Sequence, residues 1–333
     1  MSAIDIDWGR DGRQAGYIHL PSSTNTSAWQ DLRVPIYLFR NAEGPCTLLL
    51  GGSHGDEYEG ITALSALAHS LDPAVVTGSI IIVPALNLPA VTAGARLSPV
   101  DGRNLNREFP GDPRGSLTQR LAALVVSDLI PRADAVYDIH SGGRSLRFAP
   151  CTLVHEQDDA DLTRRCLAAA DAFGAPFTVV IQEPHAGQMI DDVVERSGKL
   201  MLSSELGGGA AISPGTMELT RDGLLRLLAH LGHLASPDIP PARVGRRLVV
   251  PGPAAYLHAD DLGTYEPLVE IGSSVTAGTV IGRLHFVDRF DRVPQALRAP
   301  LDGILLCTHG QGLVRRDDVI ALIAVPHEDP GTL

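Results

Sequence analysis

Residues 46–60 read CTLLLGGSHGDEYEG, a short apolar run followed by a glycine-rich turn and the start of a helical pattern. The apolar run at 47–50 is bounded by glycine, which is typical of a buried strand. The apolar periodicity of residues 61–71 predicts a helix directly after the turn. Open α/β sheets place their sites at such turns, at the carboxyl ends of strands. The stretch therefore predicts an α/β fold with a site at this turn.

The turn carries an imidazole and a carboxylate, His54 and Glu57, three residues apart. Side chains at positions i and i+3 share a helix face, so these two can converge on one ion. Zinc binds imidazole and carboxylate ligands, and a catalytic zinc site uses three protein ligands and keeps one position open. The pair therefore predicts two metal ligands and requires a third from elsewhere in the chain.

Composition and charge exclude several classes of protein. The chain has 333 residues, of which 44% are hydrophobic and 20% charged, as expected for a globular protein with a large core. A formal net charge of −12 and the lack of a long basic run argue against nucleic acid or an anionic membrane as partner. No secretory signal, no membrane-spanning stretch and no paired cysteines are visible, so we expect a cytoplasmic protein with free thiols.

Strand-like and helical stretches alternate from residue 34 to about residue 233, which predicts a mixed or mostly parallel sheet with helices on both faces. The predicted strands are 35–38, 47–50, 80–84, 135–139, 152–155, 178–181 and 199–203. The predicted helices are 61–71, 118–130, 159–173, 189–197 and 220–234. After a proline-rich break at 236–241, short apolar runs without a convincing helix predict a small β domain.

We therefore expect three parts in the chain. Residues 1–40 form an N-terminal segment that packs on the β domain or the core, 41–236 a catalytic α/β domain, and 245–330 the small β domain. Two phrases of the last part, at 271–282 and 299–304, resemble the barrel-sandwich fold of biotinyl and lipoyl carriers. Those carriers modify a lysine in a hairpin, whereas the only lysine here is Lys199, in the α/β domain. A carrier role is thus excluded.

The third metal ligand is predicted to be His140. It follows the predicted buried strand 135–139 and precedes two glycines, which repeats the layout of the first motif. Asp138 would share a strand face with His140 and orient its imidazole. A lone histidine at such a position is more often a hydrogen-bonded core residue. Two histidines and a glutamate at strand ends of one sheet favour a metal site instead.

At this point the chain resembles the zinc carboxypeptidase superfamily and, within it, the succinylglutamate desuccinylase/aspartoacylase family. The His-x-x-Glu ligand pair and distant His of that family are matched by His54, Glu57 and His140. The resemblance covers roughly residues 40 to 330. It implies a zinc-carboxypeptidase-like mixed sheet flanked by helices, a barrel-sandwich-like C-terminal β domain, and one Zn²⁺ per chain.

Two further positions match residues that act on the substrate in this family. The general-base glutamate matches Glu205 in the phrase SSELGGG, and an arginine downstream of an Asn-x-x-Ala pattern matches Arg96. The resemblance implies that Glu205 takes a proton from water and passes it to the leaving nitrogen. It also implies that Arg96 stabilises the oxyanion, because developing charge needs a fixed donor.

The phrase DGRNLNREFPG contains the family's Asn-Arg motif at Asn106 and Arg107. The resemblance implies that these two residues hold the free carboxylate of the substrate. Arg103 in the same phrase either joins them in substrate binding or forms an ordinary salt bridge with Asp101 or Glu108. The sequence leaves these two alternatives equal.

The expected reaction is hydrolysis of an amide in a small N-acylated amino acid. The combined motifs look most similar to the bacterial branch of the family that deacetylates Nα-acetyl-L-2,4-diaminobutyrate in ectoine breakdown. A peptidase, a deacylase of the succinylglutamate or N-acetylaspartate type, and a non-catalytic metal- or small-molecule-binding relative stay open as alternatives. The expected partner is the substrate, with homo-oligomer formation and a substrate-pocket role of His185 also left open.

Overall fold

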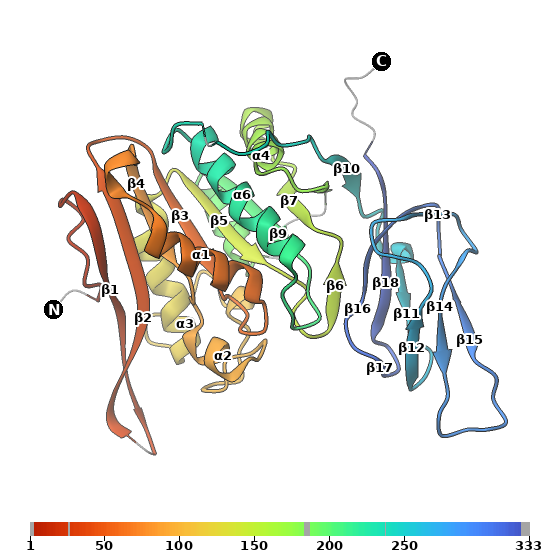
Figure 1. Ribbon diagram of the computed structural model, residues 1–333. Helices are drawn as coiled ribbons and strands as arrows, with labels where there is room; N and C mark the ends of the chain where they lie inside the picture. The colour runs from red at the N-terminus through yellow and green to blue at the C-terminus, as the bar shows by residue number, and fades with distance from the viewer. Residues whose placement is uncertain (1–2, 26, 183–186, 237, 328–333) are drawn as a thin grey trace.

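The computed structural model describes residues 3–25, 27–182, 187–236 and 238–327. Over these residues the strands form one 14-stranded mixed sheet and a separate four-stranded antiparallel sheet (Figure 1). Along the large sheet the strand order is β1-β2-β4-β3-β5-β9-β7-β8-β10-β18-β16-β13, with β11 and β6 paired to β18 and β16. The predicted fold class, a mixed α/β sheet with helices plus a small β part, is confirmed.

The strands of the large sheet have the following bounds: β1 Gly12–Thr24, β2 Ser27–Asn41, β3 Cys46–Gly51, β4 Gly78–Val83, β5 Ala135–His140, β6 Leu146–Phe148, β7 Cys151–His155, β8 Phe177–Ile181, β9 Leu200–Glu205, β10 Arg246–Val249, β11 Tyr256–His258, β13 Ser274–Val275, β16 Gly303–His309 and β18 Val319–Pro326. The small sheet contains β12 Gly263–Pro267, β14 Val280–His285, β15 Gln295–Arg298 and β17 Leu313–Val314. The α-helices are α1 Tyr58–Ser70, α2 Leu88–Ala93, α3 Leu117–Leu124, α4 Ala160–Phe173, α5 Ile190–Arg196 and α6 Pro214–His230.

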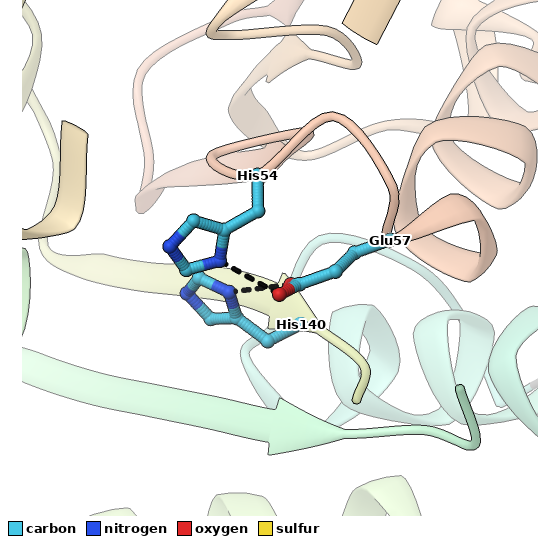
Figure 2. A group of neighbouring side chains, drawn as sticks. All are labelled: His54, Glu57 and His140. Carbon is cyan, nitrogen blue, oxygen red and sulfur yellow. Dashed lines mark hydrogen bonds and ion pairs between the residues drawn. The ribbon is translucent and has the colours of Figure 1, made fainter. Parts of the chain in front are cut away.

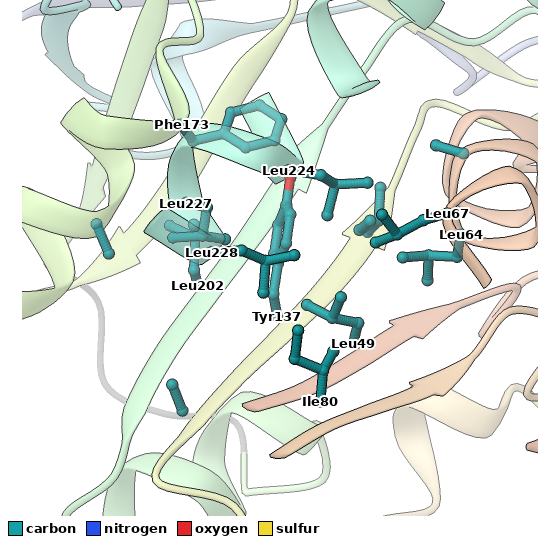
Figure 3. Close-up of a cluster of buried hydrophobic side chains, with 14 of the residues drawn as sticks. Leu49, Leu64, Leu67, Ile80, Tyr137, Phe173, Leu202, Leu224, Leu227 and Leu228 are labelled. Carbon is teal, nitrogen blue, oxygen red and sulfur yellow. The ribbon is translucent and has the colours of Figure 1, made fainter. Parts of the chain in front are cut away.

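Helices cover both faces of the large sheet. On one face α1, α4 and α6 pack their apolar residues against β5 and β9, with Tyr137 and Phe173 among the largest buried side chains (Figure 3). On the other face α3 and α5 pack against the same strands and against β1 and β2. Because both faces are covered, β3 carries the continuous buried run Leu48–Leu50 rather than an alternating pattern. Among the residues described, no helix is both long and apolar enough to cross a bilayer.

Two predicted helices have different bounds in the structure. Helix α6 begins at Pro214 rather than at residue 220, because Ser213 caps it by accepting a hydrogen bond from the Thr216 amide at 3.0 Å. The helix predicted over 118–130 is regular only to Leu124 and then continues as a π-turn, Val125–Leu129. These differences arise at caps and turns, where periodicity gives no signal.

The N-terminal segment forms a hairpin at one edge of the large sheet. Strand β1 pairs antiparallel with β2, and β2 pairs antiparallel with β4. The prediction of a strand only at 35–38 is too short, since β2 spans 15 residues. Buried positions in β2 are confined to residues 34–39, and all positions before Val34 are partly or fully exposed. A strand with one exposed face lacks the continuous apolar run that identifies a buried strand.

The C-terminal part continues the large sheet. Strand β10 pairs parallel with β8 and antiparallel with β18, and β18 pairs in turn with β16. The four-stranded sheet packs on β16 and β18 through a shared apolar core that includes Ile281, Leu305 and Ile323. The two parts of the chain are therefore joined by a continuous ladder of backbone hydrogen bonds.

Candidate metal centre and active site

Three neighbouring parallel strands, β3, β5 and β9, end at the same edge of the large sheet. Gly51 at the end of β3 lies opposite Ile139 of β5, and His140 lies opposite Glu205 of β9. The turn after β3 carries His54 and leads to Glu57, the N-cap residue of α1. The parallel register therefore places the first motif, the end of β5 and the end of β9 next to one another.

His54, Glu57 and His140 converge on one point (Figure 2). The Nδ1 atom of His54 lies 2.7 Å from Glu57 Oε1, and the Nδ1 atom of His140 lies 2.8 Å from Glu57 Oε2. One ligand atom from each residue lies within 4.8 Å of the others, and all three side chains are buried. The structure thus brings together the three residues that the sequence singled out.

The far ring nitrogen of each histidine is held by an acceptor. His140 Nε2 donates to Asp138 Oδ2 at 2.8 Å, and His54 Nε2 donates to Asn104 Oδ1 at 2.9 Å. Asp138 is fully buried and also accepts from Ser53 Oγ at 3.1 Å. Such acceptors fix the tautomer and ring orientation of metal-binding histidines, which leaves both Nδ1 atoms facing the same point.

Asn104 was missed by the sequence analysis. It belongs to the phrase DGRNLNREFPG, but its contact with His54 spans 50 residues of chain, so no local spacing could have identified it. Its Oδ1 also accepts from the Asn106 amide at 3.0 Å, which starts a short 3-10 turn, Leu105–Arg107. One amide side chain therefore anchors the whole loop to the histidine.

The electrostatics of the cluster favour a cation. Burial raises the pKa of Glu57, but the His54 and His140 imidazoles outweigh it and hold the pKa of that carboxyl well below its usual range. Burial lowers the pKa of His140, but Asp138 and Glu57 outweigh it and raise this pKa well above its usual range. The buried Glu57 carboxylate is thus stabilised by positive charge next to it, which the protonated imidazoles supply. A divalent ion can supply the same charge in place of the imidazole protons. Two imidazole nitrogens and a carboxylate fit zinc and similar transition metals.

Glu205 lies at the end of β9, beside His140 in the register of the sheet. Its Oε2 atom is buried and has no hydrogen-bond partner among the residues described. Burial, together with the negative charge of Glu57, raises the pKa of Glu205 to about 8. A carboxyl group with a pKa near neutrality beside a group of candidate metal ligands is suited to accepting and donating protons.

Arg96 reaches the cluster from the loop after α2. Its Nη1 atom lies 3.3 Å from Glu57 Oε1 and 3.4 Å from His54 Nδ1. This approach depends on Gly55, because a Cβ atom there would lie 1.9 Å from the carbonyl oxygen of Ala90 in α2. The Gly55 amide donates to the Ala95 carbonyl at 2.9 Å, which holds the motif turn against this loop.

The remaining predicted residues lie farther along the same loop. Asn106 is buried and its Oδ1 accepts from the Ile190 amide at 3.1 Å, while the exposed Arg107 donates to the Asn106 carbonyl at 2.6 Å. Arg103 donates to Glu108 Oε1 at 2.8 Å, so the salt bridge is the alternative that the structure contains. Within the described part of the chain, no hydrogen bond links these three to the side chains of the candidate metal site, and His185 lies outside the described part.

Comparisons with known proteins place the chain in a family. The model of the succinylglutamate desuccinylase/aspartoacylase catalytic domain matches residues 43–231. The chain is 42% identical to an N-alpha-acetyl-L-2,4-diaminobutyric acid deacetylase from Halomonas elongata, over 98% of this chain and 95% of that protein.

Two solved structures have the same fold. The product-bound ectoine utilization protein EutE (DoeB) from Ruegeria pomeroyi superposes with a TM-score of 0.92 at 37% identity, covering 97% of this chain and 98% of that one. A succinylglutamate desuccinylase/aspartoacylase from Rhodobacter sphaeroides gives a TM-score of 0.91 at 41% identity, covering 98% and 100%. The matched motifs, the fold and these relatives together establish that the chain belongs to the succinylglutamate desuccinylase/aspartoacylase family.

Proposed function

We propose that the protein is a zinc-dependent amidohydrolase that removes the acetyl group of Nα-acetyl-L-2,4-diaminobutyrate, giving acetate and diaminobutyrate. The observation that carries the reaction type is the buried His54–Glu57–His140 group with Glu205 on the adjacent strand. The name of the Halomonas relative, 42% identical over nearly the whole chain, supports the substrate.

Each side chain of the site has a distinct part in this reaction. When bound, a zinc ion supplies a Lewis acid that polarises the scissile carbonyl and makes water nucleophilic near neutral pH. Glu205 takes the proton of the attacking water and then passes it to the leaving nitrogen, for which a pKa raised toward neutrality is suited. Arg96, already 3.3 Å from Glu57, donates to the oxygen on which negative charge develops.

Recognition of the amino acid half falls to the loop that carries Asn106 and Arg107. An arginine binds a carboxylate through two parallel hydrogen bonds, and Arg107 is exposed and available for such a contact. Asn104 ties this loop to His54, so the carboxylate site and the metal site keep a fixed separation. Fixed separation selects substrates in which the carboxylate lies a set distance from the amide.

The test is hydrolysis of a panel of N-acyl amino acids by the zinc-loaded enzyme. Release of diaminobutyrate from its Nα-acetyl derivative should exceed release from N-succinylglutamate and N-acetylaspartate by at least tenfold in kcat/KM. Equal rates on these compounds would assign the enzyme to another deacylase activity of the family. Absence of hydrolysis with full zinc loading would overturn the proposal and favour a binding protein.

Two variants with matched controls separate the roles of the residues. Glu205→Gln should keep one zinc per chain and lose activity by about 10²–10⁴-fold, the usual contribution of general acid–base catalysis. Glu218→Gln on the exposed face of α6 is the control and should behave as the parent. His140→Ala should abolish zinc retention, whereas His230→Ala, at an exposed histidine, should not. Full activity of Glu205→Gln would exclude Glu205 as the base.

A further inference from the structure

A mostly apolar cavity of about 290 Å³, with Gln182 and Tyr256 among its lining residues, lies beside Glu205, where the large sheet passes into the C-terminal part of the chain. Its walls come from four consecutive strands of the sheet, with Val179 on β8, Val249 on β10, Leu322 on β18 and Leu306 on β16. Small-molecule pockets typically have volumes of roughly 300–1,000 Å³ and mostly apolar walls. The cavity is therefore of a size and character to take part of a substrate.

Glu205 borders both the metal-binding group and this cavity. It stands in register with His140 on one side, and it is the only acidic side chain that lines the cavity among the described residues. Its buried Oε2 atom has no hydrogen-bond partner within the described part of the chain. A substrate group that extends from the metal-binding group past Glu205 therefore enters the apolar space.

The order of the strands in the sheet indicates which half of the substrate enters the cavity. Along the sheet the order is β4-β3-β5-β9-β7-β8, with the metal ligands at the ends of β3 and β5. The polar loop with Arg96 and Arg107 follows β4, on one side of the ligands, and the cavity lies beyond β9, on the other side. Burial of a charged amino or carboxylate group among Val and Leu side chains is strongly unfavourable. The two substituents of the scissile carbonyl therefore diverge, with the charged half toward the loop.

We propose that the cavity is a pocket for the alkyl chain of the acyl group, and that the enzyme hydrolyses linear N-acyl diaminobutyrates longer than acetyl, such as propionyl and butyryl. This inference rests on the proposed amidohydrolase function. The amide C–N bond breaks, a C–O bond to water forms, the proton passes to the leaving amine, and the carboxylate is released with its alkyl chain in the cavity.

The volume supports chains of several carbons. Apolar cavities of roughly 150 Å³ are known to bind benzene, and this one is larger. A buried methylene contributes ~0.8 kcal/mol, which corresponds to about a fourfold gain in kcat/KM for each added carbon. The butyryl compound should therefore be cleaved with a kcat/KM about tenfold or more above that of the acetyl compound.

The test compares acetyl, propionyl and butyryl diaminobutyrate in the parent enzyme and in two variants that fill the cavity. Leu306→Phe fills it from a fully buried position, and Val249→Phe from a half-buried position that tolerates a larger side chain more readily. Leu262→Phe, at an exposed leucine outside the cavity, is the matched control. The quantity compared is the ratio of kcat/KM for butyryl to that for acetyl within one preparation, so a reduced folded fraction does not affect it.

The filling variants should lower this ratio at least tenfold, and the control should leave it unchanged. Calorimetry on zinc-loaded Glu205→Gln should show tighter binding of the butyryl than of the acetyl compound, a measurement that needs no turnover. Hydrolysis of the acetyl compound alone, or a butyryl-to-acetyl ratio that Leu306→Phe and Val249→Phe do not change, would overturn the pocket and leave the proposed function standing. Failure to hydrolyse any chain length would overturn both.

Discussion

Replacement of Asp138 by Asn is expected to weaken zinc binding about 10- to 100-fold while the fold is kept. Asp138 is fully buried and accepts from His140 Nε2 at 2.8 Å and from Ser53 Oγ at 3.1 Å. Asparagine has nearly the same shape and keeps one acceptor oxygen. It removes the negative charge, which makes the imidazole of His140 a weaker ligand.

The expected loss corresponds to ~1.4–2.7 kcal/mol of binding free energy. The other histidine provides an internal comparison, because His54 Nε2 donates at 2.9 Å to the neutral amide of Asn104. Charge-assisted hydrogen bonds are about twice as strong as neutral ones. Asn104→Ala should therefore weaken zinc binding by about threefold to tenfold, which is less than the loss expected for Asp138→Asn.

The assay is competition for zinc between each metal-free variant and a chromophoric chelator at one pH and salt concentration. Circular dichroism and thermal unfolding of the metal-free proteins establish that each variant is folded. Zinc binding by Asp138→Asn as tight as that of the parent would refute a role for the Asp138 charge. A greater loss of affinity in Asn104→Ala than in Asp138→Asn would refute it as well, because the charge of the acceptor would then have no influence.

Three further predictions concern stability. Gly55→Ala should lower the free energy of unfolding by about 1–3 kcal/mol, measured by denaturant titration, because its Cβ would lie 1.9 Å from the Ala90 carbonyl oxygen; an unchanged midpoint would contradict this close packing. His233 is fully buried, its Nε2 atom lies 2.7 Å from Thr47 Oγ1, and burial lowers its pKa. The contribution of His233 to the free energy of unfolding is therefore complete above about pH 6.5 and is lost as the pH falls below that value. His233→Leu should therefore destabilise by about 1–3 kcal/mol at pH 7.5 and by less at pH 5, and a constant difference would exclude this titration. In the metal-free protein, burial and Glu57 raise the pKa of Glu205 to about 8, so the folded state binds the proton more tightly and stability falls as the pH rises from about 4.5 to 8. The Glu205→Gln variant should lack this decrease in the free energy of unfolding, which amounts to up to about 1.4 kcal/mol per pH unit in the parent. Identical dependences of the unfolding free energy on pH in the two proteins would contradict the raised pKa of Glu205.

The features that the sequence predicts well are those set by local periodicity. The strand before His54 is a continuous apolar run and the strand before His140 is interrupted only by Asp138, and glycines lie close after both, so both predicted ligand positions follow from short stretches of chain. The predicted strands at 80–84, 152–155 and 178–181 correspond to β4, β7 and β8 within one or two residues. Buried parallel strands are recognisable because both of their faces must be apolar.

The features that the sequence did not predict depend on contacts between distant segments. Asn104 meets His54 only because the loop after α2 folds back over the motif turn. The pocket beside Glu205 is made by β8, β10, β16 and β18, whose side chains are ordinary aliphatic residues in the sequence. Of hairpin β1–β2 only residues 35–38 were predicted as a strand, because a strand with an exposed face has no continuous apolar run. In each case the information lies in tertiary neighbours that no window of the sequence contains.

The continuous ladder from β8 through β10 to β18 has a consequence for dissecting this enzyme. A chain truncated after the α/β part would expose the unpaired backbone groups along one side of β8, together with the apolar side chains that β16 and β18 now cover. Open apolar edges of this kind recruit strands from other molecules, so such a fragment should aggregate rather than work as a smaller enzyme. Chimeras between relatives should accordingly exchange β10 and everything after it as one block, with the joint placed in the proline-rich segment that precedes β10.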